Sequence, residues 1–285
     1  MPTTLMRQLL AACALIVLAG CSATTLINAL VPVSQLDVRK GLAYGDQPRQ
    51  QLDVYVPRLE AAAPRPLVVF FYGGSWQSGE RAEYLFVGEA LTAMGAVAII
   101  PDYRLYPEVQ FPVFLDDAAL AVSWARKHAR EFGADPDRVF LMGHSAGAHI
   151  VTMLSLDPEY LARVGESPKH LAGVVGLAGP YDFLPLTSEN LKRVFAPDPT
   201  LARTQPINFA TANAPPMLLA TGLADTTVSP RNSDRLAAKL KALGAPVTEI
   251  RYEGINHYTL VGYLAAPFRS RTTVFEDIAR FLRER

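Results

Sequence analysis

The stretch Gly143-His144-Ser145-Ala146-Gly147 sets a serine between two glycines, and its flanking residues predict its fold. Residues 138–142 are mostly apolar and β-prone, which predicts a buried strand. Residues 146–156 are rich in Ala, Ile, Met and Leu and lack proline, which predicts a helix. At such a sharp strand-to-helix turn the serine hydroxyl is exposed, and the glycines leave room where a β-carbon would clash. Ser145 is therefore a candidate nucleophile; the alternative is a tight turn that happens to hold a serine.

A serine nucleophile of this kind needs an acid and then a histidine further along the chain. Residues 216–222 predict a strand ending in a glycine turn, and Asp225 follows closely. A second predicted strand, 247–252, is followed by the loop that carries His257. Each of these residues follows a strand end, where the loops of a parallel sheet face a common site. Ser145, Asp225 and His257 therefore occur in the order that acyl transfer requires.

Other residues compete for these roles. Asp182 also follows a predicted strand and is the rival acid. His144 lies inside the pentapeptide, and His149 is one helical turn past the serine and could pack beneath the site. Two further histidines lie in polar surroundings typical of solvated side chains: His128 and His170. None of these four histidines has an acidic partner on a following loop, which favours His257 as the base.

A pair of glycines directly follows a buried strand near the start of the chain. Residues 66–71 are largely apolar, and Gly73 and Gly74 come just after them. Backbone N–H groups must come close to a developing negative oxygen, and glycine permits that approach. The pair therefore predicts an oxyanion hole, whose alternative is a plain glycine turn.

Three motifs resemble those of the α/β-hydrolase superfamily, near hormone-sensitive-lipase-like carboxylesterases, kynurenine-formamidase-like enzymes and feruloyl-esterase-like enzymes. Those enzymes carry His-Gly-Gly-x-Trp where this chain has residues 72–76. Their Asp-Tyr-Arg-Leu-x-Pro-Glu run is matched by residues 102–108, and their Gly-His-Ser-Ala-Gly-Ala-His elbow by residues 143–149. The resemblance covers the chain from about Leu36 to the C-terminus.

This resemblance implies hydrolysis of a small-molecule ester, with the N–H groups of Gly73, Gly74 and Ala146 as oxyanion donors. Tyr72 stands where those enzymes have a loop-ordering histidine. Tyrosine keeps a polar tip but is longer, so we expect the change to affect the shape of the acyl pocket more than the activity. Two alternatives stay open: an arylformamidase-like amide hydrolase, and a non-catalytic envelope lipoprotein that uses the fold for binding.

The order of predicted elements fits an α/β-hydrolase fold over residues 36–285. Residues 36–44 and 51–56 read as an antiparallel start to the sheet. Strands and helices then alternate, which is typical of a mostly parallel central sheet with helices on both faces. The proline-rich segment 180–215 interrupts this alternation, and its length predicts a small cap insertion over the site. Surface padding is the alternative for this segment.

Residues 1–20 resemble a bacterial lipoprotein signal peptide. Their apolar run, 9–18, is too short to span a bilayer. It ends in Leu18-Ala19-Gly20-Cys21, which resembles a lipobox, whereas Cys13 has almost no apolar region before it.

Lipidation of Cys21 would leave residues 21–35 as a tether. By the same resemblance, Ser22 rather than Asp after the cysteine implies an outer-membrane lipoprotein that faces the periplasm. The alternative is an ordinary cleaved signal and a soluble secreted or periplasmic protein.

The composition indicates no binding partner besides the ester substrate and the lipid anchor. Lys plus Arg and Asp plus Glu both number 27, so no basic surplus indicates nucleic acid or anionic lipid. The only two cysteines give neither a disulfide framework nor metal-ligand spacing. The expected chemistry needs no metal or cofactor, and the sequence leaves the oligomeric state open.

Overall fold

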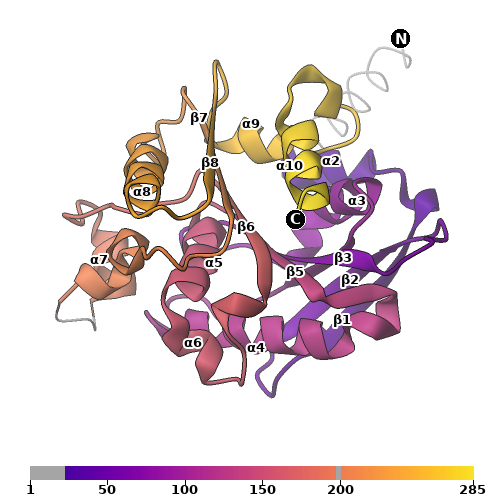
Figure 1. The fold of residues 1–285 in the computed structure, drawn as a ribbon, viewed down its shortest axis with the longest axis horizontal. Coiled ribbons are helices and arrows are strands. Elements are labelled where there is room, and N and C mark those ends of the chain that lie inside the picture. The colour runs from indigo at the N-terminus through magenta and orange to yellow at the C-terminus, as the bar shows by residue number, and fades with distance from the viewer. Residues whose placement is uncertain (1–22, 197–199) are drawn as a thin grey trace, which may run out of the picture.

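An eight-stranded sheet organises the residues that the computed structural model describes, 23–196 and 200–285 (Figure 1). The strands are β1 (Leu36–Ala43), β2 (Gln51–Pro57), β3 (Arg65–Phe71), β4 (Val97–Pro101), β5 (Ala134–His144), β6 (Leu171–Leu177), β7 (Met217–Gly222) and β8 (Val247–Tyr252). Their order across the sheet is β1-β2-β4-β3-β5-β6-β7-β8. β1, β2 and β4 pair antiparallel, and all later neighbours pair parallel. This confirms the expected mostly parallel sheet with an antiparallel start.

Helices cover both faces of this sheet. The helices of the described residues are α2 (Ala23–Ala29), α3 (Leu85–Ala93), α4 (Val113–His128), α5 (Ala146–Leu156), α6 (Pro158–Ala162), α7 (Glu189–Phe195), α8 (Arg231–Ala242), α9 (His257–Gly262) and α10 (Val274–Arg283). α4, α5 and α6 pack against one another on one face, while α3 and α10 lie on the other (Figure 1). Residues 67–71 of β3, residues 139–143 of β5 and nearly all of β6 are apolar and buried because both faces are covered.

The segment 180–215, expected to form a cap, contains α7 and two 3-10 turns, Ala202–Thr204 and Pro206–Phe209. Phe195 of α7 is fully buried and packs edge-on against Trp76, with ring centroids 4.9 Å apart. The segment is therefore held to the body by an aromatic cluster next to the glycine loop.

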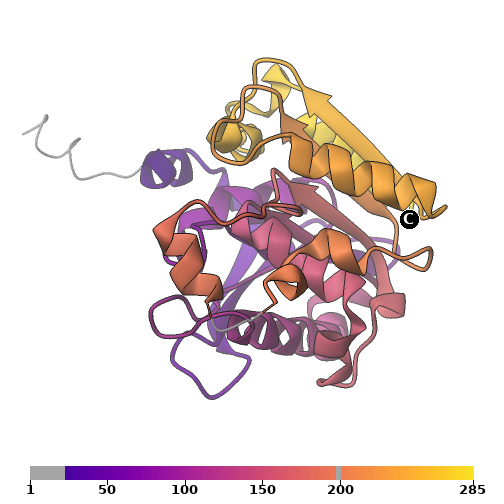
Figure 2. The same ribbon diagram turned by 90° about the vertical axis from the view of Figure 1, so that its left-hand side faces the viewer.

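The N-terminal part of the described chain is ordered against the body. Residues 23–35 lie in the expected tether, and they form α2 and a 3-10 turn, Val33–Gln35. Figure 2 shows α2 at the margin of the body. Cys21 and the proposed signal peptide lie outside the described residues. Among residues 23–196 and 200–285, no helix combines the length and hydrophobicity needed to cross a bilayer.

Candidate active site

Ser145 lies at the turn between β5 and α5 in a strained backbone conformation. Its φ is 56° and its ψ is −120°, which a non-glycine residue rarely adopts. A Cβ on Gly147 would lie 1.9 Å from the carbonyl oxygen of Phe71, and one on Gly143 would lie 2.3 Å from the backbone of Gly147. The two glycines are thus required by close packing of the elbow on itself and on β3, as the pentapeptide predicted.

His257 and Asp225 are brought together although they lie on separate loops. The Nδ1 of His257 is 2.7 Å from Oδ2 of Asp225, and both side chains are buried. The other carboxylate oxygen of Asp225 accepts hydrogen bonds of 2.8 Å from the N–H groups of Thr227 and Val228. Burial opposes ionisation of Asp225, but the hydrogen bond from His257 and those from the two N–H groups outweigh it and lower the pKa of the carboxyl.

His257 is held in place from two directions. Asn256 caps α9 by accepting hydrogen bonds from the N–H groups of Tyr258 and Thr259. The Nε2–H of His144 donates to the carbonyl oxygen of His257 over 2.9 Å. Burial, and then the nearby His257, lower the pKa of His144 to about 3, so its ring stays neutral and can serve as a fixed support. The sequence around His144 carries no signal for this contact, because its partner lies 113 positions away.

The glycine loop after β3 passes directly over Ser145. A Cβ on Gly73 would lie 2.9 Å from the Cβ of Ser145. Gly74 has a φ of +115°, and its own Cβ would lie 2.1 Å from the carbonyl oxygen of Ser78. The N–H of Ser78 donates to the Gly74 carbonyl over 3.1 Å, which closes the loop. Gly73, Gly74 and Ala146, which follows Ser145 directly, are therefore gathered around the nucleophile.

Tyr72 supports this loop from beneath. Its ring stacks on Tyr84 and Tyr103, with centroids 5.3 and 5.0 Å away. Its hydroxyl donates to Oδ1 of Asp102 over 2.7 Å and accepts from Arg49 over 3.0 Å. The side chain is fully buried and lines neither cavity at Ser145 in the described chain. Tyr72 therefore contacts the loop from within the core, and any effect of it on the acyl pocket would pass through the position of that loop.

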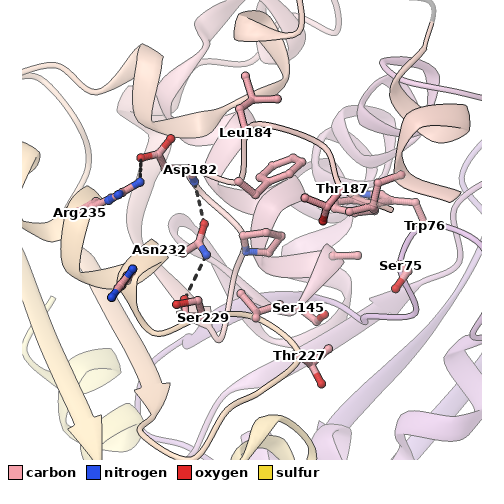
Figure 3. Close-up of a pocket in the computed structure, with 16 residues that line it drawn as sticks. Ser75, Trp76, Ser145, Asp182, Leu184, Thr187, Thr227, Ser229, Asn232 and Arg235 are labelled. Atoms are coloured by element: carbon pink, nitrogen blue, oxygen red, sulfur yellow. Dashed lines mark hydrogen bonds and ion pairs between the residues drawn. The ribbon is translucent and has the colours of Figure 1, made fainter. Parts of the chain in front are cut away.

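Two cavities meet at Ser145. The first, of about 420 Å³, has an apolar wall that includes Trp76 and Phe183 and a polar wall from the start of α8 (Figure 3). The second, of about 370 Å³, is lined by Gly73, Gly74, Ser145 and His257. Because Ser145 borders both, an ester carbonyl at Ser145 could direct its acyl part into one cavity and its alcohol part into the other.

The rival residues lie elsewhere. Asp182 lines the first cavity and pairs with Arg235 over 2.8 Å, as Figure 3 shows, rather than with His257. His149 is buried beneath Trp76, and its Nε2 is 2.8 Å from the carbonyl oxygen of Thr204. The last two histidines form hydrogen bonds within their own segments. Nδ1 of His128 contacts the carbonyl oxygen of Trp124, and Nδ1 of His170 contacts the carboxylate of Glu166. Only Asp225 meets His257 among the acidic residues considered.

The sheet, the elbow and the residues around it define a protein of the α/β-hydrolase fold. Within that fold the chain belongs to the BD-FAE family, whose sequence model matches residues 52–240. Among solved structures, esterase B from Lactobacillus rhamnosis aligns with a TM-score of 0.79 at 21% identity, over 99% of this chain and 97% of that one. Apo Thermogutta terrifontis esterase 2 aligns with a TM-score of 0.71 at 26% identity, over 88% and 95%.

Curated relatives are similar over most of this chain. A probable isoprenylcysteine alpha-carbonyl methylesterase, ICMEL1 of Arabidopsis thaliana, is 32% identical over 266 residues, covering 85% of this chain and 55% of that protein. Esterase LipC of Mycobacterium tuberculosis is 30% identical over 238 residues, covering 77% and 59%. The chain therefore spans little more than half the length of these relatives.

Proposed function

We propose that this chain is a carboxylic-ester hydrolase with Ser145 as nucleophile, His257 as base and Asp225 as acid. The proposal is carried by the 2.7 Å contact between His257 Nδ1 and Asp225, beside a serine in a strained elbow. The similarity to proteins named esterases and methylesterases supports the same reaction class.

In the proposed reaction, His257 removes the hydroxyl proton as Oγ of Ser145 attacks the ester carbonyl carbon. The carbonyl π-bond electrons move to the oxygen, which then accepts hydrogen bonds from the N–H groups of Gly73 or Gly74 and of Ala146. When the tetrahedral intermediate collapses, His257 protonates the departing alcohol. Water, activated by the same histidine, then attacks the acyl-enzyme and releases the acid.

Asp225 contributes through its charge. Its lowered pKa keeps the carboxylate ionised at neutral pH, so it stabilises the imidazolium that forms on His257. The hydrogen bond also fixes the tautomer with the proton on Nδ1, which leaves Nε2 free to accept the serine proton.

We also propose that Cys21 is lipidated and that the enzyme is anchored in the bacterial cell envelope, facing the periplasm from the outer membrane. Support comes from the apolar run 9–18 and the lipobox-like residues before Cys21. The bound lipid, not a spanning helix, would hold the protein at the membrane.

A fluorophosphonate probe tests the proposed nucleophile. The full chain should be labelled covalently and should hydrolyse p-nitrophenyl acetate, whereas Ser145→Ala should do neither. Ser155→Ala is the matched control, because Ser155 is a buried serine of α5 whose hydroxyl donates to the Val151 carbonyl. Labelling that survives in Ser145→Ala would assign the nucleophile to another residue. A parallel assay with N-formylkynurenine would measure any amide hydrolysis.

A further inference from the structure

Helix α2 is fixed beside the catalytic residues although it precedes the whole sheet in the chain. The side-chain amide of Asn28 donates to the carbonyl oxygen of Ala82 over 3.0 Å. Its side-chain oxygen accepts from the N–H of Phe86 over 3.1 Å. Because Phe86 lies in the first turn of α3, whose N–H groups lack partners within the helix, Asn28 caps α3 from a separate element. This double contact docks α2 onto the body.

One side of α2 forms part of the catalytic cavity. Thr24 and Ile27 are three residues apart, so they share a face of the helix. Both line the second cavity together with Ser145 and His257. A substrate that fills this cavity would therefore meet α2 as well as the catalytic residues.

Exposed apolar side chains lie on α2 and in the lining of this cavity. Leu26 in α2 and Leu30 just beyond its end are 48% and 59% exposed, and Leu26 directly precedes Ile27, which lines the cavity. Tyr258, 71% exposed, lines the same cavity next to His257. α2 itself has the sequence ATTLINA and contains no charged residue. Large exposed apolar groups on a helix that borders a cavity, together with one in its lining, are typical of a surface that contacts a partner.

The chain that precedes α2 indicates which partner. Cys21 comes three residues before Thr24, so their Cα atoms can be no more than about 11 Å apart. A lipid attached to Cys21 would therefore hold the membrane surface close to the opening of the catalytic cavity.

We propose that this opening rests on a lipid surface, with Leu26, Leu30 and Tyr258 in contact with lipid. The substrates would then be esters whose hydrocarbon chain lies in the bilayer and enters the second cavity past Thr24 and Ile27. The inference rests on the proposed ester hydrolysis and adds the class of substrate and the face that receives it.

The test compares two esters of one leaving group with the full chain bound to phosphatidylethanolamine–phosphatidylglycerol vesicles. p-Nitrophenyl acetate stays in water, and p-nitrophenyl decanoate partitions into the vesicles. In the double variant Leu26→Asp, Leu30→Asp, the rate on the decanoate divided by the rate on the acetate should fall about tenfold or more, because two leucines lose their apolar contact with lipid. Vesicle flotation reports how much of each protein is bound.

Leu59→Asp is the matched control. Leu59 is 72% exposed and follows β2, on the loop that enters β3 at the opposite end from Gly73. It should leave the ratio of the two rates unchanged. If the ratio of the decanoate rate to the acetate rate is unchanged in the double variant, the proposed lipid contact is wrong. If the wild-type protein is also a dimer that the double variant abolishes, the leucines form a contact between two copies of the chain instead. Failure to hydrolyse the acetate would instead count against the proposed function, and flotation would still report on the surface.

Discussion

The hydroxyl of Tyr72 donates a 2.7 Å hydrogen bond to Asp102, which joins the glycine loop that follows β3 to the strand-end motif that follows β4. Asp102 also accepts a 2.7 Å hydrogen bond from the backbone N–H of Arg81 and pairs with the Arg81 guanidinium. The loop above Ser145 is thus anchored on a buried, charged cluster. Residues 72–76 and 102–108, two motifs that lie apart in the sequence, are thus joined through the side chains of Tyr72 and Asp102.

Replacing Tyr72 with phenylalanine should slow turnover severalfold while leaving KM nearly unchanged. The ring stack on Tyr84 and Tyr103 is kept, but Asp102 loses a buried hydrogen bond, which costs about 1–3 kcal/mol of stability. We expect Tyr72→His to behave similarly, because the shorter imidazole loses the contact that the phenol makes with Asp102.

Tyr252→Phe is the control for this prediction. Tyr252 donates a 3.0 Å hydrogen bond to Asp277, far along the chain from the glycine loop, and its side chain is also buried. Urea unfolding should show a similar loss of stability for Tyr252→Phe without a change in kcat. Equal kcat values for wild type and Tyr72→Phe would show that this anchor does not position the glycine loop for catalysis.

Removing the nucleophile should abolish the reaction without unfolding the protein. We expect Ser145→Ala to lose about five to six orders of magnitude in kcat, as other serine-hydrolase triads do. Asp225→Asn should lose no more than His257→Ala, because the acid acts through the histidine. Steady-state kinetics measure the loss, and circular dichroism checks the fold. Substantial residual hydrolysis by purified Ser145→Ala would refute the assigned triad.

A side chain at Gly74 should lower kcat far more than it changes KM. With a φ of +115° and a Cβ only 2.1 Å from the Ser78 carbonyl oxygen, any other residue must displace the loop and its N–H groups. Loss of one oxyanion donor costs about 2.7–4 kcal/mol in the transition state. Gly74→Val should therefore reduce kcat at least about a hundredfold.

Gly95→Ala separates this effect from simple backbone strain. Gly95 also has a positive φ, +91°, but a Cβ there would meet nothing within 4 Å. It should lose some stability and keep its kcat. If both variants lost kcat in proportion to stability, the loop at Gly74 would have no special role in catalysis.

The elements and the candidate triad could be predicted from sequence because they depend on neighbouring residues. Strand periodicity, the glycines of the elbow and the order of Ser145, Asp225 and His257 are all local patterns. The supports could not be predicted in the same way. Asn28 reaches Phe86, 58 positions away, and His144 reaches the His257 carbonyl, 113 positions away. Such contacts depend on how distant elements pack, which no local pattern records.

Buried histidines should make the protein less stable in acid. Burial lowers the pKa of His149 to about 4, from an ordinary value near 6.5. Between these values the unfolded chain binds a proton that the folded chain does not, so the free energy of unfolding falls as the pH drops from about 6.5 to about 4. His149→Gln removes this titration and can keep the contact with Thr204, so its stability should depend less on pH. Urea midpoints at several pH values measure how the stability of the wild type and of His149→Gln depends on pH. If the two dependences are parallel, His149 is not the group whose titration destabilises the protein in acid.

Lipidation of the N-terminal segment would depend on Cys21 alone. If Cys21 is lipidated, Cys21→Ser should take up no radioactive palmitate and should either remain as uncleaved precursor or leave the membrane fraction. Stable anchoring follows from several acyl chains on one residue, because each buried methylene contributes about 0.8 kcal/mol. Cys13→Ser is the control and should still be labelled, because Cys13 lies within the apolar run that would be removed. A form that begins near Ala23 retains α2 and the contacts of Asn28, so it should hydrolyse p-nitrophenyl acetate as fast as the anchored protein. Wild-type protein that takes up no label and fractionates with the periplasm would replace the anchor with an ordinary cleaved signal.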